Sequence, residues 1–303
     1  MHPAKSTDWQ YNEIDASLPN NAHALALAMV GHNKRVLELG CAGGHVTRAL
    51  NKQGCRVTGI EIDPESAIRA KVGAEEVITA DLCDLSWADK LEPEQFDVVL
   101  AGDVLEHLSV PHHVLRACRA LLKPSGTLVV SLPNIAHVDA RLALLQGRFD
   151  YRPWGLLDDT HLRFYTKESA GQLLGEAGFV PVDTARVIVP VFDTEVELDR
   201  EAVRAEVLDD LLRDPEAETY QFVIAAALDS GDVAVRGLSA RNAELDERLM
   251  LERTRTAVLE SQLHELSQRL SVAETQSRDI MSTKTFRYLA PLRRLYGELR
   301  GHK

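Results

Sequence analysis

The feature that most constrains the fold is a short, glycine-rich turn between two regular segments. The stretch VLELGCAGG, residues 36–44, includes the apolar run of a buried strand predicted over 35–39, and GGHVTRALNKQG behind it has the pattern of a helix. Glycines in such a turn let the backbone approach a ligand and leave N–H groups pointing at it. A lone glycine pattern is compatible with a dinucleotide site, but many parallel sheets use glycine here only for packing.

Strand-like and helix-like segments alternate along most of the chain. After the turn come the strands RVTGIEI, EVITAD, FDVVLAG and GTLVVSLP, separated by helical stretches such as PESAIRAKV and PHHVLRACRALLKP. Two further strands, FVPVDTARVIVP and TYQFVIAAAL, close the region. The alternation predicts an α/β fold with a largely parallel sheet and helices on both faces.

Acidic residues end the strands that neighbour the turn. The second strand ends in Glu61, where a carboxylate can accept hydrogen bonds from both hydroxyls of a ribose, and the third is followed by Asp81. These acids and the acidic first strand suit a pyrophosphate poorly. They suit a ligand with a ribose, an exocyclic amine and a positive charge.

The motifs together resemble a known enzyme class. VLELGCAGG, VTGIEIDPE, ADLCDL, FDVVLAGDVLEHL and LLKPSGTLVVSLPN are similar to those of class I S-adenosylmethionine-dependent methyltransferases, particularly the branch that includes ubiquinone-pathway O-methyltransferases. The resemblance covers roughly residues 30–228. It implies a Rossmann-like seven-stranded sheet in which the last strand, TYQFVIAAAL, is antiparallel, within a domain over 20–230 that follows a lead-in over 1–19.

The resemblance also implies a set of residues that bind S-adenosylmethionine. By this match Glu61 holds the ribose, Asp81 with Leu82 meets the adenine, and Asp103 lies at the boundary between cofactor and substrate. The methionine part of the cofactor is surrounded by Glu38, Gly40, Ala42 and Gly43. Ala42 departs from the commoner glycine at its position, which narrows the turn by a methyl group without removing a backbone donor.

Two histidines are candidates for a general base that removes the proton of an acceptor hydroxyl. His161 in LLDDTHLRFYT is preferred over His107 in DVLEHL, which can instead cap the helix that follows it. A divalent metal held by Asp158, Asp159 and His161 is the less favoured alternative, because adjacent acids point in different directions on most backbones, and no metal is assigned.

A substrate lid is expected over about 135–165, where this type of methyltransferase carries one. Its aromatic and charged side chains suit a polar ring such as a sugar. The candidate substrate-binding residues are Asn134, Trp154, Asp159, Arg163 and Tyr165. The alternative interpretation is that HLRFYT is structural, with Thr166 as the N-cap of the next helix in either case.

Composition limits the functional class further. The formal net charge of −12 over 303 residues argues against general nucleic-acid binding. No apolar run reaches the ~18 residues that a transmembrane helix needs, and MHPAKSTDWQ lacks the features of a signal peptide. The four cysteines are scattered, which disfavours disulfides or a zinc knuckle. These features predict a cytoplasmic protein.

The C-terminal part predicts two non-catalytic segments. A coiled coil is expected over 233–281, and it favours a homo-oligomer over a lone solvated helix. Its seam consists of Leu245, Leu249, Leu259, Leu263, Leu266, Leu270, Ala273 and Ile280, with Glu252 and Thr256 as interruptions. Residues 282–303 form a basic amphipathic tail that either lies on an anionic membrane or is a solvated end.

Three functions remain open, and the ends of the chain bear on them. STKTFRYLAPLRRL resembles segments that follow coiled coils in bacterial enzymes of surface-polysaccharide assembly. It implies a cytoplasmic enzyme held peripherally at the inner membrane that O-methylates a sugar hydroxyl of a glycan. The first alternative is O-methylation of a phenol or quinone. The second is a non-catalytic coiled-coil interaction protein with a degenerate methyltransferase fold, against which the intact Glu61, Asp81 and glycine turn count.

Overall fold

The computed structural model describes residues 14, 18–91, 95–231 and 233–282. The chain divides into two compact units, Met1–Arg248 and Leu249–Lys303. The expected lead-in over 1–19 and the basic tail over 282–303 fall almost wholly outside the described residues. In the described part of the chain, no helix is both long enough and apolar enough to span a membrane.

The first unit alternates strands and helices as expected. Its strands are β1 Arg35–Leu39, β2 Arg56–Glu61, β3 Glu76–Thr79, β4 Phe96–Gly102, β5 Leu122–Pro133, β6 Phe179–Ile188 and β7 Thr219–Leu228. Its helices are α1 Ala22–Val30, α2 His45–Lys52, α3 Pro64–Ala70, α4 Ser86–Asp89, η2 Leu105–His107, α5 Pro111–Leu121, α6 Val138–Leu145, α7 Lys167–Glu176 and α8 Ala205–Leu212, and α9 Val233–Ser282 begins here. Thr166 caps α7, as expected, by accepting a hydrogen bond from the backbone N–H of Ser169.

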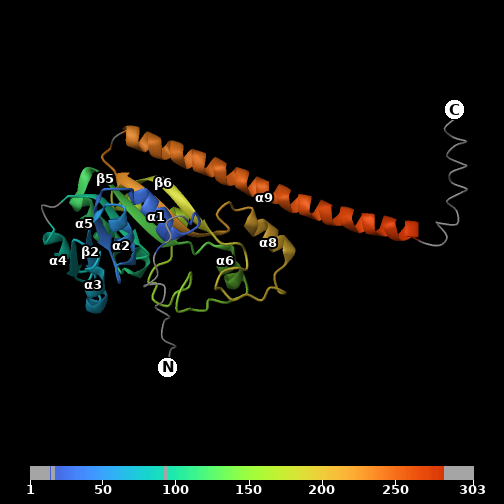
Figure 1. Cartoon of the computed structure of the whole chain (residues 1–303), viewed down its shortest axis with the longest axis horizontal. Coiled ribbons are helices and arrows are strands. Elements are labelled where there is room, and N and C mark those ends of the chain that lie inside the picture. The colour runs from blue at the N-terminus through green and yellow to red at the C-terminus, as the bar shows by residue number, and fades with distance from the viewer. Residues whose placement is uncertain (1–13, 15–17, 92–94, 232, 283–303) are drawn as a thin grey trace, which may run out of the picture. The chain divides into compact units, whose positions relative to one another are not determined.

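The strands form one seven-stranded sheet with the order β3-β2-β1-β4-β5-β7-β6 (Figure 1). The strands from β3 to β5 pair in parallel, whereas β7 is antiparallel to both of its neighbours. The predicted sheet and its antiparallel last strand are therefore confirmed. Because β1 and β4 are central neighbours, the loops that follow them open at the same edge of the sheet.

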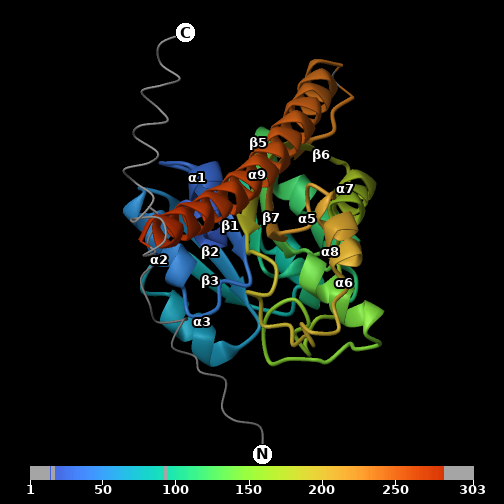
Figure 2. The same cartoon turned by 90° about the vertical axis from the view of Figure 1, so that its right-hand side faces the viewer.

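Apolar side chains cover both faces of the sheet, as buried parallel strands require. On one face, α1 and α2 pack through Leu27 and Leu50 against Val36 and Val98. On the other face, α5 and α7 pack through Leu115 and Leu174 on a larger core (Figure 2). This double layer fixes the carboxyl ends of the strands on a rigid support.

The first four turns of α9 are anchored to the sheet by polar contacts. Arg186 of β6, which is 4% exposed, bridges Asp246 of α9 at 2.6 Å and Glu216 at 2.7 Å. Ser239 donates to the carbonyl of Pro181, and Asn242 donates to that of Val182. Hydrogen bonds from Arg186 and Lys167 lower the pKa of Glu216 to about 2 despite its burial. The paired charges therefore stay ionised.

The second unit contains the rest of α9, which is a continuous helix as far as Ser282. The predicted helix is present, but a coiled coil is an assembly of helices and stays a prediction. The described seam leucines of this unit, Leu249, Leu259, Leu263, Leu266 and Leu270, are all exposed.

Candidate active site

The turn between β1 and α2 owes its shape to three residues in the left-handed region. Gly40 and Gly44 have φ of +65° and +77°. A Cβ at Gly40 would lie 2.8 Å from Val104, and one at Gly44 would lie 2.7 Å from the backbone of Ala70. Both positions thus exclude side chains, and the turn can pass close to its neighbours only because glycine occupies them.

Ala42 adopts φ +45° between these two glycines. This conformation costs a residue with a Cβ ~1–2 kcal/mol. A hydrogen bond of 2.8 Å from its backbone N–H to Oε2 of Glu61 holds the strained position. The turn after β1 and the acid at the end of β2 are therefore one structural unit.

Glu61 is 8% exposed and its other oxygen, Oε1, accepts from the backbone N–H of Asp63 at 2.9 Å. A carboxylate oxygen has two lone pairs, so each oxygen of Glu61 retains one acceptor position. Two acceptor positions are thus left for further donors, and the ribose role of Glu61 stays a prediction.

Glu38 lies in β1, two residues before Gly40, and is 4% exposed. Its Oε2 accepts from the hydroxyl of Thr47 in α2 at 2.6 Å, so the residue ties β1 to α2. Burial raises the pKa of Glu38 to about 7, with the charge of Glu61 adding to the shift. A cation nearby would favour the ionised form of this carboxyl.

A cavity of about 480 Å³ opens in front of the turn, and we call it the donor cavity. Most of the residues expected to bind the cofactor line it: Gly40, Glu61, Asp81, Leu82 and Asp103. Glu38, Ala42 and Gly43 are not among its lining residues, but the first two stabilise the turn through the hydrogen bonds with Thr47 and Glu61. His107, Cys83 and Ser109 line the donor cavity as well.

Asp103 follows β4 with φ +54°, a conformation uncommon for residues other than glycine. Its Oδ1 accepts from the hydroxyl of Ser131 at 2.5 Å and from the side-chain amide of Gln221. Its backbone N–H donates to Ser131 at 3.0 Å. β5 and β7 thus hold this carboxylate at the border of the donor cavity.

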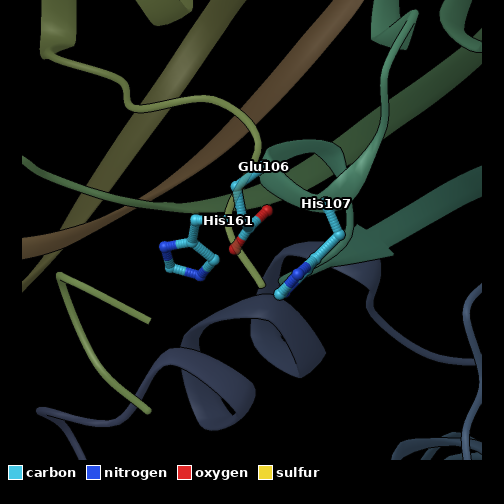
Figure 3. Close-up of side chains that lie close together, drawn as sticks. All are labelled: Glu106, His107 and His161. Atoms are coloured by element: carbon cyan, nitrogen blue, oxygen red, sulfur yellow. The ribbon is translucent and has the colours of Figure 1, made fainter. Parts of the chain in front are cut away.

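Glu106, His107 and His161 lie together beside the donor cavity (Figure 3). One donor atom from each lies within 4.8 Å of the others. The grouping includes both predicted bases and adds Glu106, which the sequence analysis does not single out. It differs from the metal set considered there, because Asp158 and Asp159 are not members.

The carboxyl group of Glu106 is 1% exposed, and neither of its oxygens has a hydrogen-bond partner among the described residues. Burial and the charge of Asp103 raise its pKa well above the usual value. The nearby phenol of Tyr165 is likewise buried and without a partner in the described part of the chain. One carboxylate and two imidazoles could hold a divalent transition metal, which would compensate the buried charge.

The two histidines differ in their surroundings. Nδ1 of His107 lies 3.2 Å from the carbonyl oxygen and from the hydroxyl of Thr160, so the segment predicted to form a lid fixes its ring. His161 stacks edge-on against His107 with ring centroids 4.8 Å apart. Burial, and then His107, lower the pKa of His161. Only His107 of the two lines the donor cavity.

The predicted substrate residues take different positions. Asn134 is fully buried and its amide bonds to the carbonyl of Thr219, so it fixes a loop. Arg163 donates to the carbonyl of Ser109 at 2.7 Å. Trp154 lines a second cavity, whereas Asp159 is exposed and lines neither this cavity nor the donor cavity. Tyr220 and Glu195 also line the second cavity, and no sequence motif points to these two residues, because they lie far along the chain.

Comparison with known proteins gives a family for this architecture. The profile of a family described as "methyltransferase domain" matches residues 14–184, more than half of the chain. Among solved structures, the chain resembles a SAM-dependent methyltransferase from Archaeoglobus fulgidus with a TM-score of 0.49 and 19% identity, over 69% of this chain and 95% of that one.

Several similar relatives carry the name ubiquinone biosynthesis O-methyltransferase. The one from Cereibacter sphaeroides is 34% identical over 49% of this chain and 61% of its own length. The one from Actinobacillus pleuropneumoniae is 37% identical over 33% of this chain and 46% of its own length. The chain thus spans less than two thirds of the length of these relatives.

The raised pKa of Glu38 makes stability depend on pH. Between about 4.5 and about 7 the folded state retains a proton that the unfolded state has lost, so the free energy of unfolding falls as pH rises through this range. In the unsubstituted protein, the free energy of unfolding should fall by at most about 3 kcal/mol across this range. We expect Glu38→Gln to abolish this fall, while its side-chain oxygen can still accept from Thr47. Urea unfolding of the unsubstituted protein and of Glu38→Gln, at about pH 5 and about pH 8, measures the free energy of unfolding. Identical pH profiles for the two would contradict the assignment.

Proposed function

This chain belongs to the methyltransferase-domain family of S-adenosylmethionine-dependent enzymes, and on that premise we propose that it methylates a hydroxyl group of a small ring compound. The observation that carries the proposal is the strained β1–α2 turn, bound to Glu61 and open to the donor cavity. In the proposal, Glu61 receives the ribose hydroxyls, Asp81 and Leu82 border the adenine, and Gly40 borders the methionine part.

The acceptor is proposed to be a phenol. Its support is the printed name of the relatives, ubiquinone biosynthesis O-methyltransferase, and this evidence favours the phenol or quinone alternative over the sugar. Of the segment that suggested polysaccharide assembly, only Ser282 belongs to the described residues. A sugar hydroxyl remains the second candidate, since Trp154 lies with carboxylates around the second cavity, a combination that also suits sugars.

The transfer itself is an in-line displacement. The acceptor oxygen bonds to the methyl carbon while the sulfur–methyl bond breaks and its electron pair goes to sulfur, which leaves S-adenosylhomocysteine. The hydroxyl proton passes to a base. We assign that role to His107, because it lines the donor cavity and the lid fixes its ring, and a neutral His161 beside it avoids a second positive charge.

Donor binding is tested with a matched pair of variants. We expect Glu61→Gln to weaken S-adenosylmethionine binding about tenfold to hundredfold, since a charge-assisted hydrogen bond to a ribose hydroxyl is worth ~1.5–3 kcal/mol. Glu65→Gln alters an exposed acid four residues away and leaves affinity unchanged. Isothermal titration calorimetry of both folded variants with S-adenosylmethionine measures the affinity. Unchanged affinity in Glu61→Gln would overturn the donor assignment.

The base assignment predicts an asymmetry between the histidines. His107→Gln should lower kcat by about 100-fold, the contribution of a general base, and His161→Gln by less than tenfold. Steady-state kinetics with catechol as acceptor measures kcat, and calorimetry verifies that both variants still bind the donor. A greater loss in His161→Gln would restore His161 as the base.

Self-association through the second unit is proposed as well. The exposed leucines Leu259, Leu263, Leu266 and Leu270 recur at the four and three spacing of a coiled-coil seam. A continuous row of exposed leucine side chains on one helix is typical of a surface that another helix covers. A second copy of this chain presents the same self-complementary row.

A lysine on the seam should separate the copies. We expect the full chain to sediment as a dimer or larger species at micromolar concentration, and Leu263→Lys to sediment as a monomer. Val272→Lys changes another exposed apolar residue, off the seam, and leaves the oligomer intact. A monomeric native chain, or equal effects of both variants, would rule out the seam as the interface.

A further inference from the structure

A second cavity of about 360 Å³ lies on the other side of Asp103, and we call it the acceptor cavity. It is formed by the start of α1 and by residues near the adjoining ends of β6 and β7, with Trp154 from the lid. Asp103 lines both cavities, and no other residue is shared by the two described linings. A group that touches Asp103 from this cavity therefore adjoins the donor cavity.

The lining of the acceptor cavity carries acids but no strong base. Asp103, Asp193 and Glu195 contribute carboxylates, and His23 is the only basic side chain among the described lining residues. No lysine or arginine lines it in this part of the chain. An anionic acceptor would thus meet like charges without a compensating cation.

Glu195 is fixed in this wall by two donors. Its Oε2 accepts from the hydroxyl of Tyr220 at 3.0 Å, and its Oε1 accepts from the backbone N–H of Leu156. Gly155 leaves the space that the carboxylate occupies, since a Cβ there would lie 2.0 Å from Oε1. Burial and Glu195 together raise the pKa of Tyr220, so its phenol stays neutral and donating.

Asp103 is held in the same way, by the hydroxyl of Ser131 and the amide of Gln221. Two carboxylates with fixed orientations can each accept from a further hydroxyl through unused lone pairs. The indole of Trp154 is 61% exposed and provides an apolar surface for a ring that enters.

We propose that the acceptor cavity binds an uncharged ring that carries hydroxyl groups, and that Asp103 and Glu195 select against acceptors that carry an anionic group. This inference rests on the proposed methyltransferase function and specifies its substrate class. The reacting hydroxyl lies beside Asp103 at the border of the donor cavity, where it is methylated and gives its proton to His107. A further hydroxyl bonds to Glu195 and orients the ring.

The experiment compares neutral and carboxylated acceptors in matched pairs. The probes are catechol against 3,4-dihydroxybenzoate, and methyl glucoside against methyl glucuronide, with S-adenosylmethionine as donor and the full chain as enzyme. We expect kcat/KM for at least one neutral probe to exceed that of its carboxylated partner by about tenfold or more, because the added anion adjoins fixed carboxylates.

Two variants test whether Glu195 causes the preference for neutral acceptors. Glu195→Gln keeps an oxygen for Tyr220 but removes the charge, and we expect it to reduce the preference at least threefold. Glu197→Gln changes an exposed acid that pairs with Arg152 outside the cavity, and it leaves the preference unchanged. A preference that neither variant alters, or that both alter equally, would overturn the role of Glu195.

Calorimetry with the donor separates the two levels of failure. Bound S-adenosylmethionine together with equal rates for neutral and anionic probes would overturn the acceptor inference alone. Bound donor with no turnover of either neutral probe would do the same. Absence of donor binding in folded protein would overturn the methyltransferase proposal and, with it, the inference.

Discussion

The hydrogen bond between the backbone of Ala42 and the carboxylate of Glu61 is the constraint on which the site depends. It joins the turn after β1 to the end of β2 and holds a residue in a conformation that its side chain disfavours. Glu61 also accepts a hydrogen bond from the backbone N–H of Asp63, the N-cap residue of α3. One acid therefore fixes both the start of α3 and the shape of the donor cavity. The geometry of the ligand site is thereby built into the sheet rather than left to a mobile loop.

Asp103 has the corresponding role between the two cavities. Its position follows from β4, but its orientation depends on Ser131 of β5 and Gln221 of β7, which lie 28 and 118 residues away. The antiparallel last strand therefore contributes to the site as well as closing the sheet. Under the proposed function, the methyl donor and the acceptor both adjoin this carboxylate, and their alignment is the main requirement of a displacement reaction.

The fold, and the gathering of the expected donor residues at one edge of the sheet, could be predicted from the sequence because both depend on local patterns. The turn after β1, Glu61 and Asp81 follow consecutive strands of a parallel sheet, and parallel strands bring their carboxyl ends to one edge. The acceptor cavity could not be predicted in this way, since Glu195 and Tyr220 come from irregular and antiparallel segments. Glu106 could not be predicted for a different reason: the burial that leaves it without a hydrogen-bond partner among the described residues has no sequence signature.

The excess of acids around the donor cavity has a consequence for turnover under the proposed function. Glu61 and Asp103 line the donor cavity, and Glu38 is close enough to Glu61 for their charges to interact. The pKa of about 7 at Glu38 applies in the absence of a cation. A bound sulfonium stabilises the ionised form of Glu38, which in turn attracts the donor. Methyl transfer removes the positive charge, so the same carboxyl regains its tendency to take up a proton. The electrostatic attraction that favours the donor is absent for the neutral thioether product, which favours exchange of product for fresh donor.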